Sequence, residues 1–274
     1  MTRRLNIWLL SVLLIIGIPY YWHLVDAGAG PGAAEPRAKP VTMTQLRALA
    51  GALGEARPLA LRVETVGRRM VSGNMLVAGS GLKLVPTAIR AYELVMPDGG
   101  PVVIDAGTSA QAARDRGFDP FDPAAQARIQ RALDRAGHTV LLDDKPVHNG
   151  GTAAGTRRAG TDLPLPGGAP WTLAPGVVVI PLPGLGPGAN MVYAQLADGR
   201  EILFTGDAAK TAANWTVPRL PARFATRDEP TPYRSENLSW LMTIATLHRA
   251  APKMAVVPGH DLANVPFSAG PFLD

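Results

Sequence analysis

Four short apolar segments, each leading to a polar residue beside glycine, constrain this sequence more than any other feature. Runs of this length and composition are typical of buried strands. We expect the polar residues that follow these strands to meet at one edge of a sheet. The segments are 102–105 ending in Asp105, 141–151 with His148, 204–208 with Asp207, and 257–261 with His260.

The sequence around these segments predicts a mixed α/β fold. Apolar stretches 91–96 and 101–105 flank a Pro-Asp-Gly-Gly turn, and 192–196 and 201–204 flank an Ala-Asp-Gly-Arg turn, so each pair predicts a β-hairpin. Hairpins indicate a largely antiparallel arrangement and not a doubly wound parallel sheet. Further strands are expected at 61–66, 139–142, 177–182 and 255–257.

Three stretches have the pattern of helices. Thr42 and Gln45 have the spacing of a capping box before a stretch that runs to about residue 53. Asp122 and Pro123 are suited to the N-cap and first position of a second helix, which we expect Gly137 to close, with His138 serving the helix end. Residues 237–249 have helical periodicity.

The amino terminus carries a signal for export, for which two interpretations stay open. Residues 5–22 are apolar after Arg3 and Arg4, and as a helix they span about 27 Å, which predicts a membrane anchor with the rest of the chain on the extracytoplasmic (periplasmic) side. The alternative is a signal peptide cleaved near residues 27–29, which would leave a secreted or periplasmic domain.

We therefore divide the chain into an anchor or signal peptide (1–26), a flexible linker rich in Ala, Gly and Pro (27–41) and one folded domain (42–274). The linker contains almost nothing to bury. The sequence leaves the oligomeric state open.

Composition excludes several kinds of site. The chain has no cysteine, so it has neither disulfides nor thiolate ligands for zinc. The net charge of +5 is spread over scattered lysines and arginines without interleaved aromatic residues, so we expect no nucleic-acid partner.

In their order and separations, these segments resemble the metallo-β-lactamase superfamily of metal-dependent hydrolases. Residues 104–107 are similar to its I-D-T-G motif, 204–208 to F-T-G-D-A and 258–260 to P-G-H, and 183–188 lie where P-G-H-T-P-G belongs. The resemblance covers about residues 60–265. It implies an αββα sandwich, that is, an α+β fold with two sheets between helices.

The metal-binding motif of this family is degenerate here. The family's T-H-x-H-x-D-H-x-G-G aligns with residues 142–151, where the two histidines of the first metal site are replaced by Asp143 and Lys145. Val147 replaces an aspartate of the second site, and Leu185 replaces the third histidine of the first site. The resemblance therefore implies that the first metal site is lost.

The second metal site keeps a set of three ligands, which the resemblance assigns to His148, Asp207 and His260. Two imidazoles and a carboxylate suit zinc first, with iron or manganese as alternatives, and Asp143 is a candidate for a fourth ligand. We expect Asp207, His148 and Lys145 to take part in catalysis, in which metal-activated water attacks an ester, lactone, thioester or amide carbonyl of a small molecule. The alternative is a non-catalytic pseudoenzyme that keeps the fold as a binding or regulatory module outside the membrane and holds no metal.

Lys145 leads to a sharper hypothesis. Its ammonium would lie near the vacated first site and form an ion pair with Asp207 or Asp143. Asp105 is expected to organise its loop. The aromatic residues of the family's pocket-wall region are expected to pack in the ordinary way; they are Trp215, Phe224, Tyr233 and Trp240.

Overall fold

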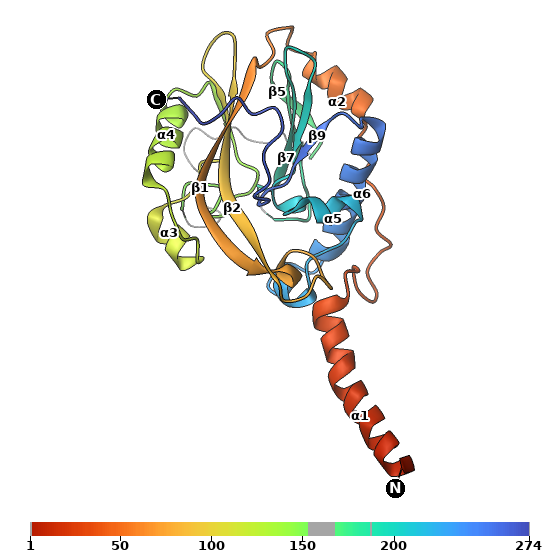
Figure 1. The fold of residues 1–274 in the computed structure, drawn as a ribbon. Helices are drawn as coiled ribbons and strands as arrows, with labels where there is room; N and C mark the ends of the chain where they lie inside the picture. Colours follow the sequence, from red (N-terminus) through yellow and green to blue (C-terminus); the bar gives the residue numbers. More distant parts are fainter. Residues whose placement is uncertain (1, 153–167, 187, 274) are drawn as a thin grey trace.

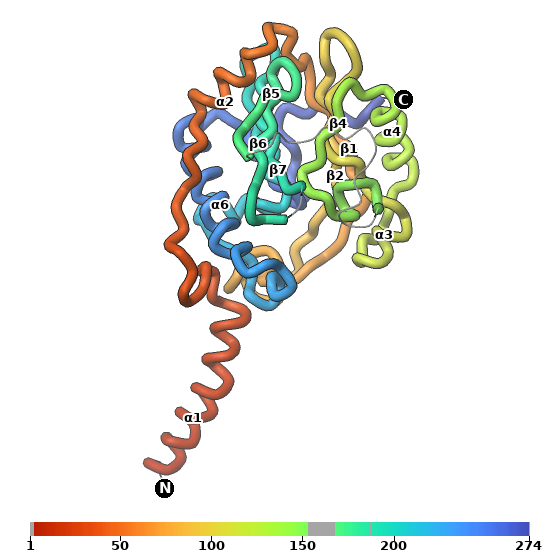
Figure 2. Tube along the Cα trace, turned by 180° about the vertical axis from the view of Figure 1, so that it is seen from behind, coloured from red at the N-terminus to blue at the C-terminus, as the bar shows by residue number. Residues whose placement is uncertain are grey.

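The computed structural model describes residues 2–152, 168–186 and 188–273. Two β-sheets lie face to face, with helices on their outer faces (Figures 1 and 2). The first sheet has the order β1 (Ala60–Ser72), β2 (Leu84–Val95), β3 (Val102–Ile104) and β4 (His138–Val140). The second has the order β5 (Trp171–Ala174), β6 (Val177–Pro181), β7 (Asn190–Gln195), β8 (Glu201–Phe204) and β9 (Ala255–Val257).

Most strand pairs are antiparallel, as the hairpin patterns predict. Within each described sheet, only the last pair is parallel: β3 with β4, and β8 with β9. This places the carboxyl ends of β3, β4, β8 and β9 where their following loops can meet.

Helices cover both outer faces of the two sheets. Helices α3 (Ala110–Asp115) and α4 (Pro123–Asp134) lie on the side of the first sheet, whereas α2 (Met43–Ala50), α5 (Ala212–Thr216) and α6 (Tyr233–Ala250) lie on the side of the second (Figure 1). Four short helical turns complete the described elements: η1 (Tyr21–Val25), η2 (Gly73–Met75), η3 (Gly206–Ala208) and η4 (Arg223–Thr226).

Three apolar clusters confirm the αββα layering. The central cluster joins the inner faces of both sheets and includes Tyr92, Ile104, Val192 and Phe204, with Tyr92 and Phe204 in ring contact at 4.7 Å. One outer cluster joins the second sheet to α2 and α6, and the other joins the first sheet to α3 and α4. Each sheet is therefore buried on both faces.

The predicted helix starts are confirmed by their hydrogen bonds. Thr42 Oγ1 accepts from the Gln45 amide at 3.2 Å, and Asp122 Oδ1 accepts from the amides of Ala124 and Ala125 at 2.9 and 3.0 Å. Both side chains satisfy amides that a helix start leaves without a partner.

The predicted end of α4 is wrong. The helix stops at Asp134, and His138 is the first residue of β4. Gly137 has a different role, because its backbone lies against that of Gly100: a Cβ on Gly100 would lie 2.4 Å from the Gly137 nitrogen. This close approach requires glycine at position 100, and it leaves a Cβ on Gly137 only 3.0 Å from the Gly100 carbonyl oxygen.

Strands β1 and β2 form a long hairpin that the sequence does not predict. The strand expected at 61–66 continues to Ser72, and its partner begins at Leu84 instead of 91. Charged residues such as Arg68 and Arg69 interrupt the apolar pattern in this half of the hairpin, so the sequence conceals it.

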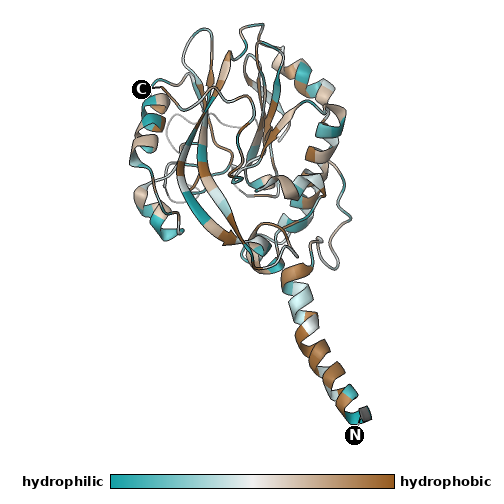
Figure 3. Ribbon diagram, in the orientation of Figure 1, coloured by the Kyte–Doolittle hydropathy of each residue, from teal (hydrophilic) through white to brown (hydrophobic). Residues whose placement is uncertain are grey.

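The N-terminal helix α1 (Thr2–Tyr20) stands away from the two sheets, and brown, hydrophobic residues dominate it (Figures 1 and 3). The helical segment Arg3–Val25 is long and apolar enough to cross a membrane, and its apolar window is 0% buried. A signal sequence has the same features, so both predictions for this segment stay open.

Residues 26–41 contain neither helix nor strand, but they hydrogen-bond to α6. Arg234, only 9% exposed, donates to the Gly28 carbonyl at 2.8 Å, and the amide of Lys39 donates to Thr243 Oγ1 at 2.8 Å. The segment between α1 and the folded domain is thus held along α6.

Candidate metal centre

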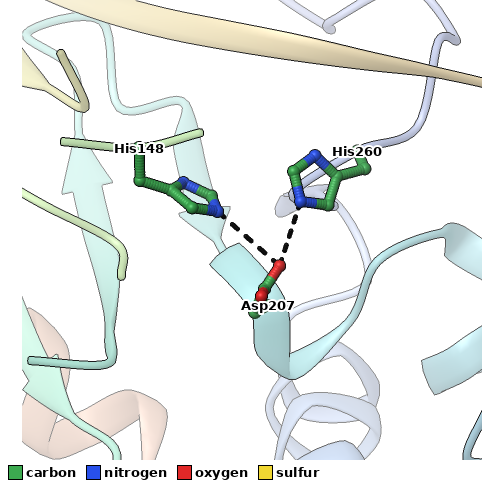
Figure 4. Close-up of side chains that lie close together, drawn as sticks. All are labelled: His148, Asp207 and His260. Carbon is green, nitrogen blue, oxygen red and sulfur yellow. Dashed lines mark hydrogen bonds and ion pairs between the residues drawn. The ribbon is translucent and has the colours of Figure 1, made fainter. Parts of the chain in front are cut away.

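Loops after four strands bring the predicted polar residues together. Asp105 follows β3, His148 lies in the loop after β4, Asp207 lies in η3 after β8, and His260 follows β9. Figure 4 shows the two imidazoles pointing at one carboxylate. The side chains meet, as predicted, but they follow strands of both sheets and not the edge of one sheet.

Glycine allows two of these loops to touch. A Cβ on Gly259 would lie 2.5 Å from the Gly206 carbonyl oxygen, closer than a side chain tolerates. Gly259 precedes His260 and Gly206 precedes Asp207, so this contact sets the separation of these two side chains.

The group formed by His148, Asp207 and His260 has the dimensions of a metal site. His260 Nε2 lies 3.0 Å and His148 Nε2 3.6 Å from the same oxygen, Oδ1 of Asp207. One potential ligand atom from each residue lies within 4.8 Å of the others. The three residues are nearly or fully buried.

Acceptors orient both imidazoles. Asp105 Oδ2 lies 2.7 Å from His148 Nδ1, and the Ala88 carbonyl oxygen lies 3.0 Å from His260 Nδ1. An acceptor beside Nδ1 fixes the proton there and leaves the Nε2 lone pair for a metal. The other Asp105 oxygen accepts from the Leu142 amide at 2.8 Å, so Asp105 organises its loop, as predicted, and also orients His148.

Lys145 lies on the opposite side of the Asp207 carboxylate. Its Nζ is 2.9 Å from Asp207 Oδ2 and 3.0 Å from Asp143 Oδ2, with Glu229 Oε1 farther away at 3.9 Å. The hypothesis of an ion pair is confirmed, and it involves both predicted carboxylates. Asp143 is thus a partner of Lys145, and its role as a fourth metal ligand stays a prediction.

These contacts shift the ionisation of the cluster. Burial by itself raises the pKa of Asp207, but the ammonium groups of Lys145 and Lys210 and the two nearby imidazoles hold this pKa well below its ordinary value. Burial and the charge of Asp207 raise the pKa of Asp143. The pKa of Lys145 is raised despite its burial, because Asp207 and Asp143 favour its charged form.

Two observations show that the three residues fit a divalent metal. His148 Nε2 is buried and has no hydrogen-bond partner among the described residues, although it faces Asp207. The donor set of two neutral imidazole nitrogens and one carboxylate is that of known mononuclear sites of zinc, iron and manganese.

Leu185, at the place of a lost first-site histidine, is 2% exposed and packs in the cluster with α6.

A cavity of about 250 Å³ opens above this group. Asp207, His260 and Lys145 line it together with Glu229, Thr87, cationic side chains and an apolar wall. The cations are Arg69, Arg116 and Lys210, and the apolar residues are Val71, Met75, Leu76, Phe118, Val147 and Ala225. A larger cavity beside Arg47 and Phe267 shares no residue with this site.

Sequence reasoning missed the cationic rim. Arg69 comes from β1, Arg116 from the end of α3 and Lys210 from the loop after η3, so no local motif joins them. Ordinary packing is confirmed for Tyr233 and Trp240, which are 2% and 3% exposed, but it is wrong for Phe224, which is 48% exposed.

Comparison with solved structures finds the same architecture. An N-acyl homoserine lactone hydrolase, with its product N-hexanoyl-L-homoserine bound at the catalytic metal center, matches with a TM-score of 0.59 and 18% identity over 77% of this chain and 98% of its own. A quorum-quenching N-acyl homoserine lactone lactonase matches with a TM-score of 0.58 and 18% identity over 78% and 99% of the two chains. A probable metal-dependent hydrolase from Staphylococcus aureus matches with a TM-score of 0.54 and 10% identity over 76% and 92%.

A scan against models of protein families finds no match, and neither does a search of curated proteins. At identities below 20%, the matches to solved structures establish the fold of this chain and leave its chemistry to the site residues.

Proposed function

We propose that this chain, which has the metallo-β-lactamase fold, is a hydrolase with one divalent metal held by His148, Asp207 and His260. Its substrate is a small molecule with an ester, lactone, thioester or amide carbonyl. The observation that carries the proposal is the convergence of two imidazoles on one carboxylate oxygen, with each Nδ1 facing an acceptor.

The donor set favours zinc, with iron or manganese as alternatives. Such an ion supplies Lewis acidity and lowers the pKa of water to about 7, which makes hydroxide available near neutral pH. Asp105 and Ala88 keep the two imidazoles in the ligating tautomer, and Lys145 holds the Asp207 carboxylate from its other oxygen.

Lys145 has a second role in the proposed reaction. Its ammonium lines the cavity beside Asp207 and is 32% exposed, so it is accessible to a carbonyl oxygen. When water adds to the carbonyl carbon, negative charge develops on that oxygen, and Lys145 donates a hydrogen bond to it. The bond to the leaving oxygen, sulfur or nitrogen then breaks, and a proton from the added water passes to this atom, so that the products are a carboxylic acid and an alcohol, thiol or amine. Asp143 keeps Lys145 charged and in place.

The lactone hydrolases of known structure share the fold of this chain, and this likeness of fold supports the proposal of a hydrolase. The non-catalytic alternative is favoured by one observation: Lys145 already supplies positive charge to Asp207 and Asp143 in the region of the lost first site. In that alternative, the cavity binds a ligand without turnover.

Hydrolysis assays with the full chain in detergent distinguish these functions. The protein, loaded in turn with zinc, iron and manganese, is assayed with a panel of esters, lactones, thioesters and amides. We expect one class to be hydrolysed and His260→Ala to abolish its turnover. Lys145→Met should lower kcat by about a hundredfold, the size of a lost donor to a developing oxyanion.

His23→Ala is the matched control, because His23 is exposed in η1 and outside the site. Its kcat should equal that of the parent. Absence of hydrolysis for the whole panel with all three metals would favour the non-catalytic alternative.

We also propose that α1 anchors the chain in a membrane and that the domain lies on the extracytoplasmic side. Arg3 and Arg4 precede the apolar span, and Asp26 follows it, as expected for a helix whose amino terminus stays in the cytoplasm.

A further inference from the structure

Elements that line the cavity lie next to η1, the turn that follows α1. Met75, Leu76 and Ala225, from η2, the residue after it and η4, line the cavity. The loop that follows η2, and η4 itself, contact η1. The amide of Gly79 donates to the Leu24 carbonyl at 2.8 Å.

Arg223 of η4 reinforces this contact. It forms an ion pair with Asp26, and its guanidinium lies 4.0 Å from the centre of the Trp22 ring. The cavity therefore lies at the end of the domain from which α1 emerges, and a bilayer around α1 would lie beside this end.

Exposed apolar side chains gather at the same end. Most of the large hydrophobic residues exposed beyond η1 lie on the lower part of the β1–β2 hairpin, directly after α5 or in η4; they are Met70, Met75, Leu82, Leu84, Val217 and Phe224. The remaining ones are Leu53, Leu59 and Leu273. In Figure 3, brown segments mark the lower end of this hairpin near α1.

Cations are interspersed with these apolar residues. Lys83 lies between Leu82 and Leu84, and the exposed Arg227 lies 4.7 Å from the centre of the Phe224 ring. Apolar side chains mixed with Lys and Arg are typical of surfaces that bind the interface of an anionic bilayer. We call Met70, Met75, Leu82, Leu84, Val217 and Phe224 the apolar end.

The rim of the cavity is mainly cationic, although the carboxylates of Asp207 and Glu229 also line the cavity. Among the described residues, no ion pair involves Arg69, Arg116 or Lys210. Arg69 donates one hydrogen bond to the Arg116 carbonyl and lies 4.5 Å from the Phe118 ring, but its buried Nε has no partner in the described part of the chain. A ligand with an anionic group and an apolar chain matches this lining.

We propose that the apolar end lies on the surface of the bilayer that holds α1, and that the cavity takes an anionic amphiphile from this surface. The amphiphile's anionic group binds Arg69, and its apolar chain lies along Met75 and Leu76. As an assignment of substrate class, this inference rests on the proposed function. As an assignment of a membrane surface, it rests on the proposed anchor α1 and not on hydrolysis.

Labelling tests the surface. The chain has no cysteine, so single cysteines can be introduced by Leu84→Cys, Phe224→Cys and, as a control of equal exposure at the other end of β1, Leu59→Cys. The full chain is placed in nanodiscs of phosphatidylcholine and phosphatidylglycerol, and each cysteine carries a fluorophore. We expect lipids with spin labels on their acyl chains to quench the labels at 84 and 224 and to leave the label at 59 unquenched. Equal quenching at all three positions would overturn the proposal.

A second measurement tests entry into the cavity. A fluorophore at Met75→Cys is exposed to a spin-labelled fatty acid or to the corresponding uncharged fatty alcohol in the same nanodiscs. We expect the acid to quench more strongly than the alcohol, and Arg69→Gln to remove the difference. Equal quenching by both probes in the parent would overturn the proposed ligand class.

Neither measurement depends on metal or turnover. A failure of these experiments is therefore distinguishable from a failure of the hydrolase proposal.

Discussion

At the scale of single residues, Lys145 changes the character of the site more than any other substitution in the family motif. It replaces a neutral metal ligand with a cation, and its ammonium lies between Asp143 and Asp207. The side chain of Asp143 is 3% exposed and that of Asp207 is 9% exposed. A carboxylate buried to this degree needs positive charge nearby to stay ionised. The Asp207 oxygen that faces the histidines remains on the other side of the carboxylate.

Lys145→Met should therefore destabilise the metal-free chain. The expected loss is about 1–3 kcal/mol of unfolding free energy, between the values for exposed and buried pairs, because Lys145 is partly exposed. Urea denaturation of the metal-free protein measures it, with Lys83→Met as the control at an exposed lysine. A Lys145→Met variant as stable as the parent would contradict the ion pair.

The pH dependence of stability tests the contact between His148 and Asp105. Burial alone lowers the pKa of His148, but Asp105 and Asp207 raise it well above the ordinary value of 6.5. A raised pKa adds stability that is complete below the unfolded value and is lost as the pH rises through the folded value. In metal-free protein, the unfolding free energy should fall as the pH rises above about 6.5.

Asp105→Asn should reduce this fall, because the amide removes the charge that favours protonated His148. Denaturant unfolding of both proteins across this pH range gives the comparison. The same pH slope in parent and variant would show that Asp105 leaves the ionisation of His148 unchanged.

At the scale of elements, local chemistry predicts where helices begin and strands turn. Asp122 and Pro123 mark the start of α4, and the Ala197–Arg200 turn marks the β7–β8 hairpin, because each signal acts within a few residues. The length of β1 and the role of Gly137 depend on partners distant in sequence. Strand 66–72 forms because β2 pairs with it, and Gly137 lies in close contact with Gly100, where a side chain would clash.

Gly259→Ala should disturb the site through the backbone. The added Cβ would meet the Gly206 carbonyl at 2.5 Å, so the loops that carry Asp207 and His260 must separate. We expect a loss of metal binding and about 1–3 kcal/mol of destabilisation from overpacking.

Gly51→Ala is the matched control, since the nearest atom to its Cβ would be 3.7 Å away and its φ is −86°. Thermal unfolding and metal titration compare the two variants. Wild-type metal affinity in Gly259→Ala would show that the contact between the loops does not set the ligand geometry.

At the scale of the whole molecule, the resemblance to the metallo-β-lactamase superfamily implies the two-sheet architecture and the set of His148, Asp207 and His260. The recognisable strand ends predict only that these residues meet. The cationic rim could not be predicted, since Arg69, Arg116 and Lys210 come from three elements and only the tertiary fold brings them together. The same holds for residues 26–41, whose contacts with α6 depend on buried Arg234.

The proposed topology predicts different labelling on the two sides of a membrane. Single cysteines from Leu59→Cys and Thr2→Cys are treated with a membrane-impermeant maleimide in bacterial cells with a permeabilised outer membrane. We expect labelling at position 59 before lysis, while the inner membrane is intact, and at position 2 only after lysis. Labelling at 59 only after lysis would contradict an extracytoplasmic domain.

The most direct test of the central claim is the metal content of the full chain, purified in detergent, incubated with zinc, iron or manganese and freed of excess ion by gel filtration. Elemental analysis should find about one equivalent of one metal in the parent and in His23→Ala, because the three-ligand set is complete for a single ion. The His148→Ala/His260→Ala double variant should hold none. Absence of metal from the parent after all three incubations, or equal metal in the double variant, would contradict a metal centre on His148, Asp207 and His260.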